Sequence, residues 1–303
     1  MKGAVLASAL FGTALKLPRA RTNGEKLRGL AFRASCAIAA VLAGVQAAPA
    51  AGSGSSEIEL RDYLFTFVSP GDALGPWHTT KLDYSYRADS DAFFVRLVSG
   101  NREDRTKPQH GEFVRLEAYH RFTHRSEIKV AVGSGDGYQP LRSTTFEAVE
   151  ALDPPGRVAF SVGTVLTSQN NIEFQRIFAV GPDLRIGSTS AYARYYAPVT
   201  TSPNRSGPGT LALNFSCPVT RSAAVTVYAN FGGEVGGDRT ASQLPTSSGR
   251  FGPDVGLAAK VGVSANLGLI ATYEVASYRS ASGAFAYMDH VAILGAYVPL
   301  GRR

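Results

Sequence analysis

The 303-residue sequence has little cysteine and no long apolar run outside its first fifty residues. Only Cys36 and Cys217 are present, and only Cys217 lies after position 50. A secreted domain held together by disulfides is therefore excluded. No run of about 20 apolar residues follows position 51, which excludes a helical membrane span there. Sixteen prolines and 32 glycines, in a chain rich in Tyr, Thr, Val and Phe, argue against long helices.

Positive charge is concentrated at the amino terminus. The formal net charge is +7, yet residues 1–50 hold seven basic residues against Glu25 as their single acidic residue. The rest of the chain is close to neutral. Its charge therefore gives no reason to expect a nucleic-acid partner.

Residues 1–50 have the order of a Sec-type signal peptide. A basic stretch at 28–33 precedes an apolar run at 34–45 that is too short to span a bilayer, and Ala-Pro-Ala at 48–50 resembles a cleavage site. We therefore expect a cleaved leader over 1–50, export to the outer membrane, and one domain over 51–303.

From residue 57 onward, apolar residues alternate with polar or small ones, as Leu267, Leu269 and Ala271 do with Gly268 and Thr272. This alternation predicts strands with two unlike faces. Most segments have about 8 to 12 residues, close to the ~9–11 with which a tilted strand crosses a bilayer. About fourteen such segments occur, near 57–68, 79–87, 92–100, 112–122, 126–133, 142–151, 157–166, 172–180, 184–196, 209–217, 223–231, 255–264, 267–278 and 287–298.

Connections between the segments alternate between tight and long. Tight ones are expected at 88–91, 123–125, 181–183, 218–222 and 265–266, and long polar ones at 69–78, 101–111, 198–208, 232–254 and 279–286. This sorting predicts an all-β, antiparallel transmembrane β-barrel of about 12–14 strands, with both termini on the periplasmic side. Aromatic residues near segment ends are expected in interfacial girdles, namely Tyr63, Trp77, Tyr138, Tyr195, Tyr196, Tyr278, Tyr287 and Tyr297.

Three stretches carry a family resemblance. They are Phe-Val-Arg-Leu-Val-Ser-Gly-Asn-Arg-Glu-Asp at 94–104, Val-Gly-Pro-Asp-Leu at 180–184 and Tyr-Ala-Arg-Tyr-Tyr at 192–196. Through them the chain resembles the YaiO family of outer membrane beta-barrel proteins, over about 60–300. The resemblance implies an outer-membrane location and a single barrel. It implies no activity and no functional residue.

The polar face of the first strands is expected to line the barrel. Its members are Lys81, Asp83, Arg87, Arg96, Arg115, Glu117, Arg121, Glu127 and Lys129. Charges of both signs on neighbouring strands allow two interpretations. They line a polar pore, or they close the lumen through their own ion pairs.

A catalytic interpretation depends on His124 and Ser126, a spacing that some outer-membrane lipid hydrolases use with an acidic partner such as Glu117 or Glu127. A turn at this point is an equally good explanation. His78, His110 and His290 are isolated in the sequence, so no metal site and no cofactor are expected.

The leading hypothesis is a non-enzymatic outer membrane barrel that acts as a narrow pore, an adhesin or a structural component. Its expected partners are outer membrane lipid, lipopolysaccharide and the barrel assembly machinery. The alternatives are a barrel hydrolase acting on lipid or lipopolysaccharide, and a soluble periplasmic β-sandwich that binds a ligand.

Overall fold

The structure is a computed structural model that describes residues 54–68, 74–104, 108–123, 125–137, 139–153, 156–169, 173–199, 209–233, 250–279 and 285–300. The expected leader and its cleavage site lie outside these residues. The described residues form fourteen strands: β1 (Ser55–Val68), β2 (Leu74–Arg87), β3 (Asp91–Asp104), β4 (Pro108–Arg121), β5 (Ser126–Gly135), β6 (Arg142–Ala151), β7 (Val158–Gln169), β8 (Glu173–Ile186), β9 (Thr189–Val199), β10 (Thr210–Pro218), β11 (Ala223–Gly233), β12 (Arg250–Ser264), β13 (Leu267–Arg279) and β14 (Phe285–Leu300).

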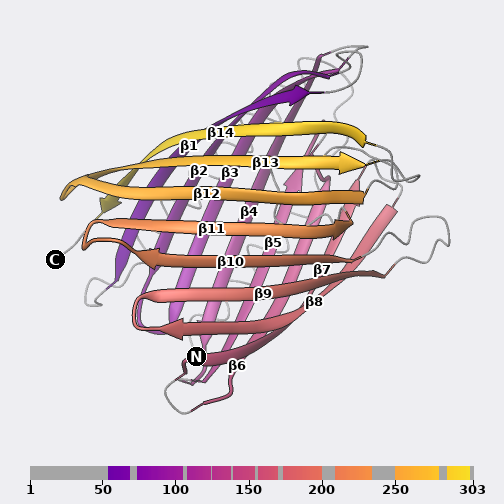
Figure 1. Cartoon of the computed structure of the whole chain (residues 1–303). Coiled ribbons are helices and arrows are strands. Elements are labelled where there is room, and N and C mark those ends of the chain that lie inside the picture. The colour runs from indigo at the N-terminus through magenta and orange to yellow at the C-terminus, as the bar shows by residue number, and fades with distance from the viewer. Residues whose placement is uncertain are drawn as a thin grey trace. The chain divides into compact units, whose positions relative to one another are not determined.

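The strands form one closed antiparallel barrel (Figure 1). Each strand pairs with its neighbours along the sequence, and β1 pairs with β14 to close the sheet. The predicted antiparallel barrel is confirmed, and a β-sandwich of two sheets is excluded. No helix in the described part of the chain has the length and hydropathy of a membrane span.

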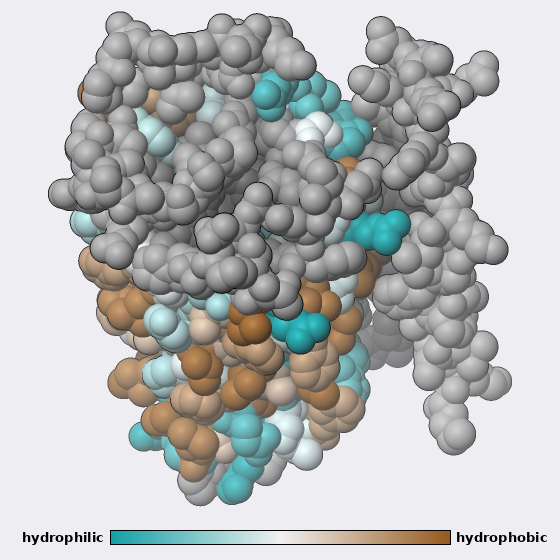
Figure 2. All heavy atoms as spheres, turned by 90° about the vertical axis from the view of Figure 1, so that its right-hand side faces the viewer, coloured by the Kyte–Doolittle hydropathy of each residue, from teal (hydrophilic) through white to brown (hydrophobic). Residues whose placement is uncertain are grey.

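The two faces of each strand have opposite character. On β13, Leu269 and Tyr273 point outward and keep 51% and 53% of their surface exposed, whereas Ile270 and Thr272 point inward and keep 5% and 9%. Figure 2 shows hydrophobic side chains gathered over the visible outer surface of the barrel. A sheet without free edges satisfies its backbone hydrogen bonds in lipid, and an apolar exterior suits contact with the lipid chains. Both features fit a membrane-spanning barrel.

One predicted turn was wrong. Residues 181–183 lie inside β8, and the chain turns instead at Gly187, whose φ of 61° favours glycine. The Gly-Pro-Asp sequence has the composition of a turn. However, Pro182 lies on β8 where the ladder to β9 skips two pairs, as suits a residue that has no backbone N–H to donate.

The predicted long connections were also too long, because the strands extend beyond the alternating segments. β2 begins at Leu74, and β12 begins at Arg250 rather than 255. Gly232 pairs with Phe251, so the ends of the predicted 232–254 loop have backbone partners after all. Glycines give no alternation but still pair through the backbone. Residues 234–249 lie outside the described residues.

The predicted aromatic girdle is largely wrong. Tyr63, Trp77 and Tyr287 point into the barrel and keep 7% or less of their surface exposed. Tyr196 and Tyr297 also lie on inward positions, whereas Tyr195 faces outward with 48% exposed. The side chains of Tyr138 and Tyr278 lie outside the described residues. Odd or even position on the strand decides which way a ring points, and closeness to a strand end does not.

Candidate functional site

The candidate site is the lumen, whose side chains change in kind along the barrel. On β1, Glu57, Glu59 and Arg61 come first from the short-turn end, and Tyr63 and Phe65 follow toward the other end. The same order holds on β2, whereas on β14 the buried Asp289 lies beside apolar residues. Along β1 and β2 the lumen therefore has a charged layer near the short turns and an apolar layer beyond it.

All nine positions of the polar set expected from the sequence lie on inward positions of β2 to β5. In the first group, Asp83 lies between two cations. Its carboxylate is 3.1 Å from Lys81 Nζ and 2.8 Å from Arg96 Nε. None of the three side chains keeps more than 26% of its surface exposed. Each of these charges therefore has an opposite charge beside it, with both cations sharing one carboxylate.

A second group continues the charged layer across β4, β5 and β6. Arg115 Nη2 is 3.1 Å from Glu117, and Lys129 Nζ lies 3.7 Å from Glu117 and 3.8 Å from Glu147. Tyr119 donates a hydrogen bond of 2.5 Å to Glu117. These pairs fit the alternative in which the lining neutralises itself.

Arg194 on β9 completes this group, and the sequence analysis missed it. Its guanidinium is 2.7 Å from Asp183 and 3.3 Å from Glu147. It also donates to the carbonyl oxygens of Gly181 and Pro182, at 3.2 and 3.1 Å, where the ladder between β8 and β9 skips. One planar side chain with five donors thus provides hydrogen bonds both to two carbonyl oxygens at the gap in the ladder and to two carboxylates.

A further group on the opposite arc was also missed. Lys260 Nζ on β12 lies 2.5 Å from Glu57 on β1 and 4.0 Å from the ring centroid of Tyr297 on β14. Arg61 pairs with Glu59. The alternation of Glu57, Glu59 and Arg61 with apolar residues could have signalled the β1 members, whereas the contact with Lys260 needs barrel closure.

The apolar layer contains an aromatic cluster formed by Phe65, Phe67, Trp77 and Tyr287, with Tyr63 and Val291 packed beside them. The rings of Phe67 and Trp77 have centroids 4.6 Å apart, and those of Phe67 and Tyr287 6.0 Å. Phe65 and Trp77 keep 1% and 3% of their surface exposed. This side of the lumen is therefore filled.

Elsewhere, rings lie along the wall. A Cβ at Gly256 would overlap the ring of Tyr228, and a Cβ at Gly268 would overlap that of Tyr297. Each ring thus lies over a neighbouring strand where glycine leaves room for it. Tyr228 is fixed there by a 2.6 Å hydrogen bond to Glu274. These rings consequently project little into the lumen.

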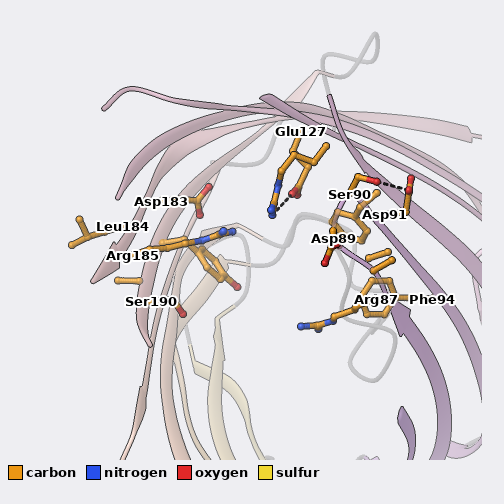
Figure 3. Close-up of a pocket in the computed structure, with 16 residues that line it drawn as sticks. Arg87, Asp89, Ser90, Asp91, Phe94, Glu127, Asp183, Leu184, Arg185 and Ser190 are labelled. Atoms are coloured by element: carbon orange, nitrogen blue, oxygen red, sulfur yellow. Dashed lines mark hydrogen bonds and ion pairs between the residues drawn. The ribbon is translucent and has the colours of Figure 1, made fainter. Parts of the chain in front are cut away.

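A cavity of about 520 Å³ occupies the short-turn end of the lumen, and we call it the vestibule (Figure 3). One wall comes from β2 to β5 and includes Arg87, Phe94 and Glu127, and the facing wall comes from β8 and β9 and includes Arg185 and Tyr192. Of the predicted polar set, Arg87, Arg121 and Glu127 line it.

The candidate catalytic pair lies elsewhere. Ser126 begins β5 on the outward face that it shares with Ile128 and Val130, and it accepts a 3.3 Å hydrogen bond from Thr123. His124 lies outside the described residues. β4 ends at Arg121 and β5 begins at Ser126, as the tight connection expected at 123–125 requires.

The histidines expected to be isolated have partners on the outer face. His78 lies 2.9 Å from Asp62, His110 2.9 Å from Asn101, and His290 2.8 Å from Tyr273. Their partners come from neighbouring strands and could not be read from the sequence. No group of three or more His, Cys, Asp or Glu among the described residues is placed to hold a metal ion.

A closed antiparallel barrel with an apolar exterior and a charged lumen defines a transmembrane β-barrel of the outer membrane. The sequence matches the family model of the YaiO membrane beta barrel domain over residues 58–213, more than half of the chain. The protein therefore belongs to this family of membrane barrels. The comparison with curated proteins gave no match.

The chain is similar to several solved structures. The CymD monoaromatic hydrocarbon channel aligns with a TM-score of 0.55 and 6% identity over 82% of this chain and 89% of the channel. Pseudomonas aeruginosa OccK3 (OpdO) gives 0.40 and 11%, covering 82% and 96%. The translocator domain of the autotransporter NalP from Neisseria meningitidis gives 0.43 and 16%, covering 89% and 97%. The likeness to CymD indicates a shared fold and says nothing of the solute.

Proposed function

We propose that this protein is a narrow, non-enzymatic pore for small solutes in the outer membrane. The vestibule carries the proposal, because it is a cavity inside the lumen with walls from opposite sides of the barrel. Barrels of about 8 strands are filled by their own side chains, and those of about 16 to 18 strands leave an aqueous channel. Fourteen strands fall between these limits.

Side chains fill part of the lumen beyond the vestibule, which supports a pore of small cross-section. The aromatic cluster fills the side formed by β1, β2 and β14. Tyr228 and Tyr297 lie against the wall over Gly256 and Gly268, which leaves more room along β11 to β13. A solute path along these strands would be narrow and bordered by polar groups.

A structural barrel without conduction is the second candidate. The observation that favours it is the pairing of the lumen charges with one another, above all around Arg194 and Asp83. A barrel hydrolase is the third. Replacing Ser126 with Ala and assaying lipid deacylation tests it, and activity that vanishes in the variant would refute the non-enzymatic proposal.

We also propose that residues 1–50 direct export through the Sec pathway and are then removed. The barrel assembly machinery then inserts the chain, and lipopolysaccharide contacts its apolar outer face. The basic, apolar and small-residue order of the leader supports export, and the exposed apolar side chains support the lipid contact.

Solute-dependent swelling of liposomes tests the pore directly. Liposomes containing the refolded mature chain should swell in glycerol or glycine and should not swell in a trisaccharide. Heat-modifiable migration of the same sample reports that the barrel is folded. A folded barrel that passes none of these solutes would refute the pore and favour the structural role.

A further inference from the structure

The charged side chains that line the vestibule differ in whether they have a partner of opposite charge. We propose that it binds small organic anions whose carboxylate or phosphate group is held by Arg87 and Arg185. The inference rests on the proposed pore, because it names the solute class that this lumen takes up. It is argued from the partners of each charged group that lines the vestibule.

The carboxylates of the vestibule are already engaged within the protein. Asp183 lies 2.7 Å from Arg194, and Glu127 lies 3.4 Å from Arg121. Asp91 accepts hydrogen bonds from Ser90, at 2.7 Å, and shares one of 2.8 Å with His120. Asp89, in the turn, is likewise engaged in an interaction of its own. Two of the four carboxylates are thus paired with arginines of the protein, and the other two are engaged in interactions of their own.

The two arginines differ from these groups. In the described part of the chain, neither Arg87 nor Arg185 has a carboxylate within ion-pair distance, and both side chains are exposed to the vestibule. Figure 3 shows them on facing walls, with both guanidinium groups directed toward the space between. Two cations that have no carboxylate partner among the described residues therefore border the same cavity.

Arg87 lies over an aromatic ring. Its guanidinium lies 5.5 Å from the ring centroid of Phe94, and Phe94 packs edge-on against Tyr119 at 5.4 Å. A cation–π contact of this kind uses none of the five N–H donors of the guanidinium. A planar guanidinium with free donors is suited to bidentate recognition of a carboxylate or phosphate.

Ring faces and volume limit the rest of the ligand. Phe94, Tyr119 and Tyr192 border the vestibule, and Tyr192 is 41% exposed there although it faces inward. A volume of about 520 Å³ lies within the ~300–1,000 Å³ common for small-molecule sites. The geometry points to an anionic head group joined to a small, flat or apolar body.

Titration calorimetry on the refolded mature barrel in detergent tests the site without requiring conduction. The probes are benzoate and phenyl phosphate, with benzyl alcohol as the neutral control and benzylamine as the cationic one. We expect both anions to bind at least tenfold more tightly than either control. Anions that bind no better than benzyl alcohol, or that bind more weakly than benzylamine, overturn the proposal.

Variants identify the residues. Arg87→Gln and Arg185→Gln should each weaken anion binding about tenfold, and the double variant should abolish it. Arg142→Gln is the matched control, because Arg142 is exposed on the outward face of β6 at the opposite end of the strand. Unchanged affinity in the double variant, or an equal loss in Arg142→Gln, refutes the assignment. Heat-modifiable migration confirms that each variant is folded.

The experiments distinguish a failure of the anion site from a failure of the pore. Specific anion binding by a barrel that passes no solute would keep the anion site and refute the pore. Solute passage with no preference among the probes would keep the pore and refute the anion site.

Discussion

At the scale of single residues, neighbouring side chains on a strand face opposite environments, one the lipid and the next the lumen. Leu269 is half exposed on the outside, whereas Ile270 beside it is 5% exposed on the inside. Val227 and Tyr228 differ in the same way, since Val227 is exposed outward and Tyr228 donates to Glu274 within the barrel. The cost of a charge should therefore depend on odd or even position rather than on depth alone.

Leu269→Arg should reduce the yield of folded barrel much more than Thr272→Arg. An arginine in the apolar belt costs ~2–4 kcal/mol near the bilayer midplane, while one at Thr272 faces the polar lumen. Refolding yield, measured by heat-modifiable migration in mild detergent, compares the two. Equal yields would contradict the assignment of the faces.

Arg194→Lys should destabilise the barrel although the charge is kept. A lysine cannot reach both carboxylates and the carbonyl oxygens of Gly181 and Pro182, so buried acceptors lose their donors at a cost of ~1–3 kcal/mol. Urea unfolding of the refolded protein measures the change. Arg185→Lys is the control, because Arg185 has no such partners, and a similar loss there would refute the role of Arg194.

At the scale of elements, the alternation of apolar and polar residues was enough to predict the strands. Local composition gave wrong turns and strand ends where pairing between strands determines them. All fourteen predicted segments overlap a strand, and residues 142–151 match β6 in full. The turn expected at 181–183 is wrong because β8 continues through it, and Arg194 of the next strand, β9, donates to the carbonyl oxygens of that stretch. The glycines near 232 and 250 pair through backbone atoms, which side-chain patterns do not report.

Gly256→Ala should destabilise the pairing of β11 and β12. The new Cβ would displace the ring of Tyr228 and break its 2.6 Å hydrogen bond to Glu274, at a cost of ~1–3 kcal/mol. Gly262→Ala on the same strand is the control, because its Cβ meets nothing closer than 3.5 Å. Urea unfolding of both variants checks this, and equal stability would show that Tyr228 does not need the glycine.

At the scale of the whole molecule, closure of the barrel brings together groups that no local pattern relates. Lys260 and Glu57 are 203 positions apart and lie 2.5 Å from each other. The first half of the charged layer could be predicted from strand alternation. The vestibule could not, because its two walls come from separate groups of strands that only the complete fold brings together. The sequence could accordingly suggest a polar lumen but not the compensation of its charges.

The mature chain should begin between Ala48 and Gly52. This expectation follows from the small residues after the apolar run at 34–45. Intact-mass analysis of protein extracted from outer membranes measures it. A chain that retains residues 28–45 would contradict cleavage of the leader.

Single-channel recording of the refolded barrel in planar bilayers tests the central claim, a narrow solute path beside the aromatic cluster. The wild type should give small, uniform conductance steps. Trp77→Ala, which removes a ring packed against Phe65 and Phe67, should give larger ones. Folded protein without steps in either form, or with steps of equal size in both, would contradict a lumen that conducts and is narrowed at this cluster.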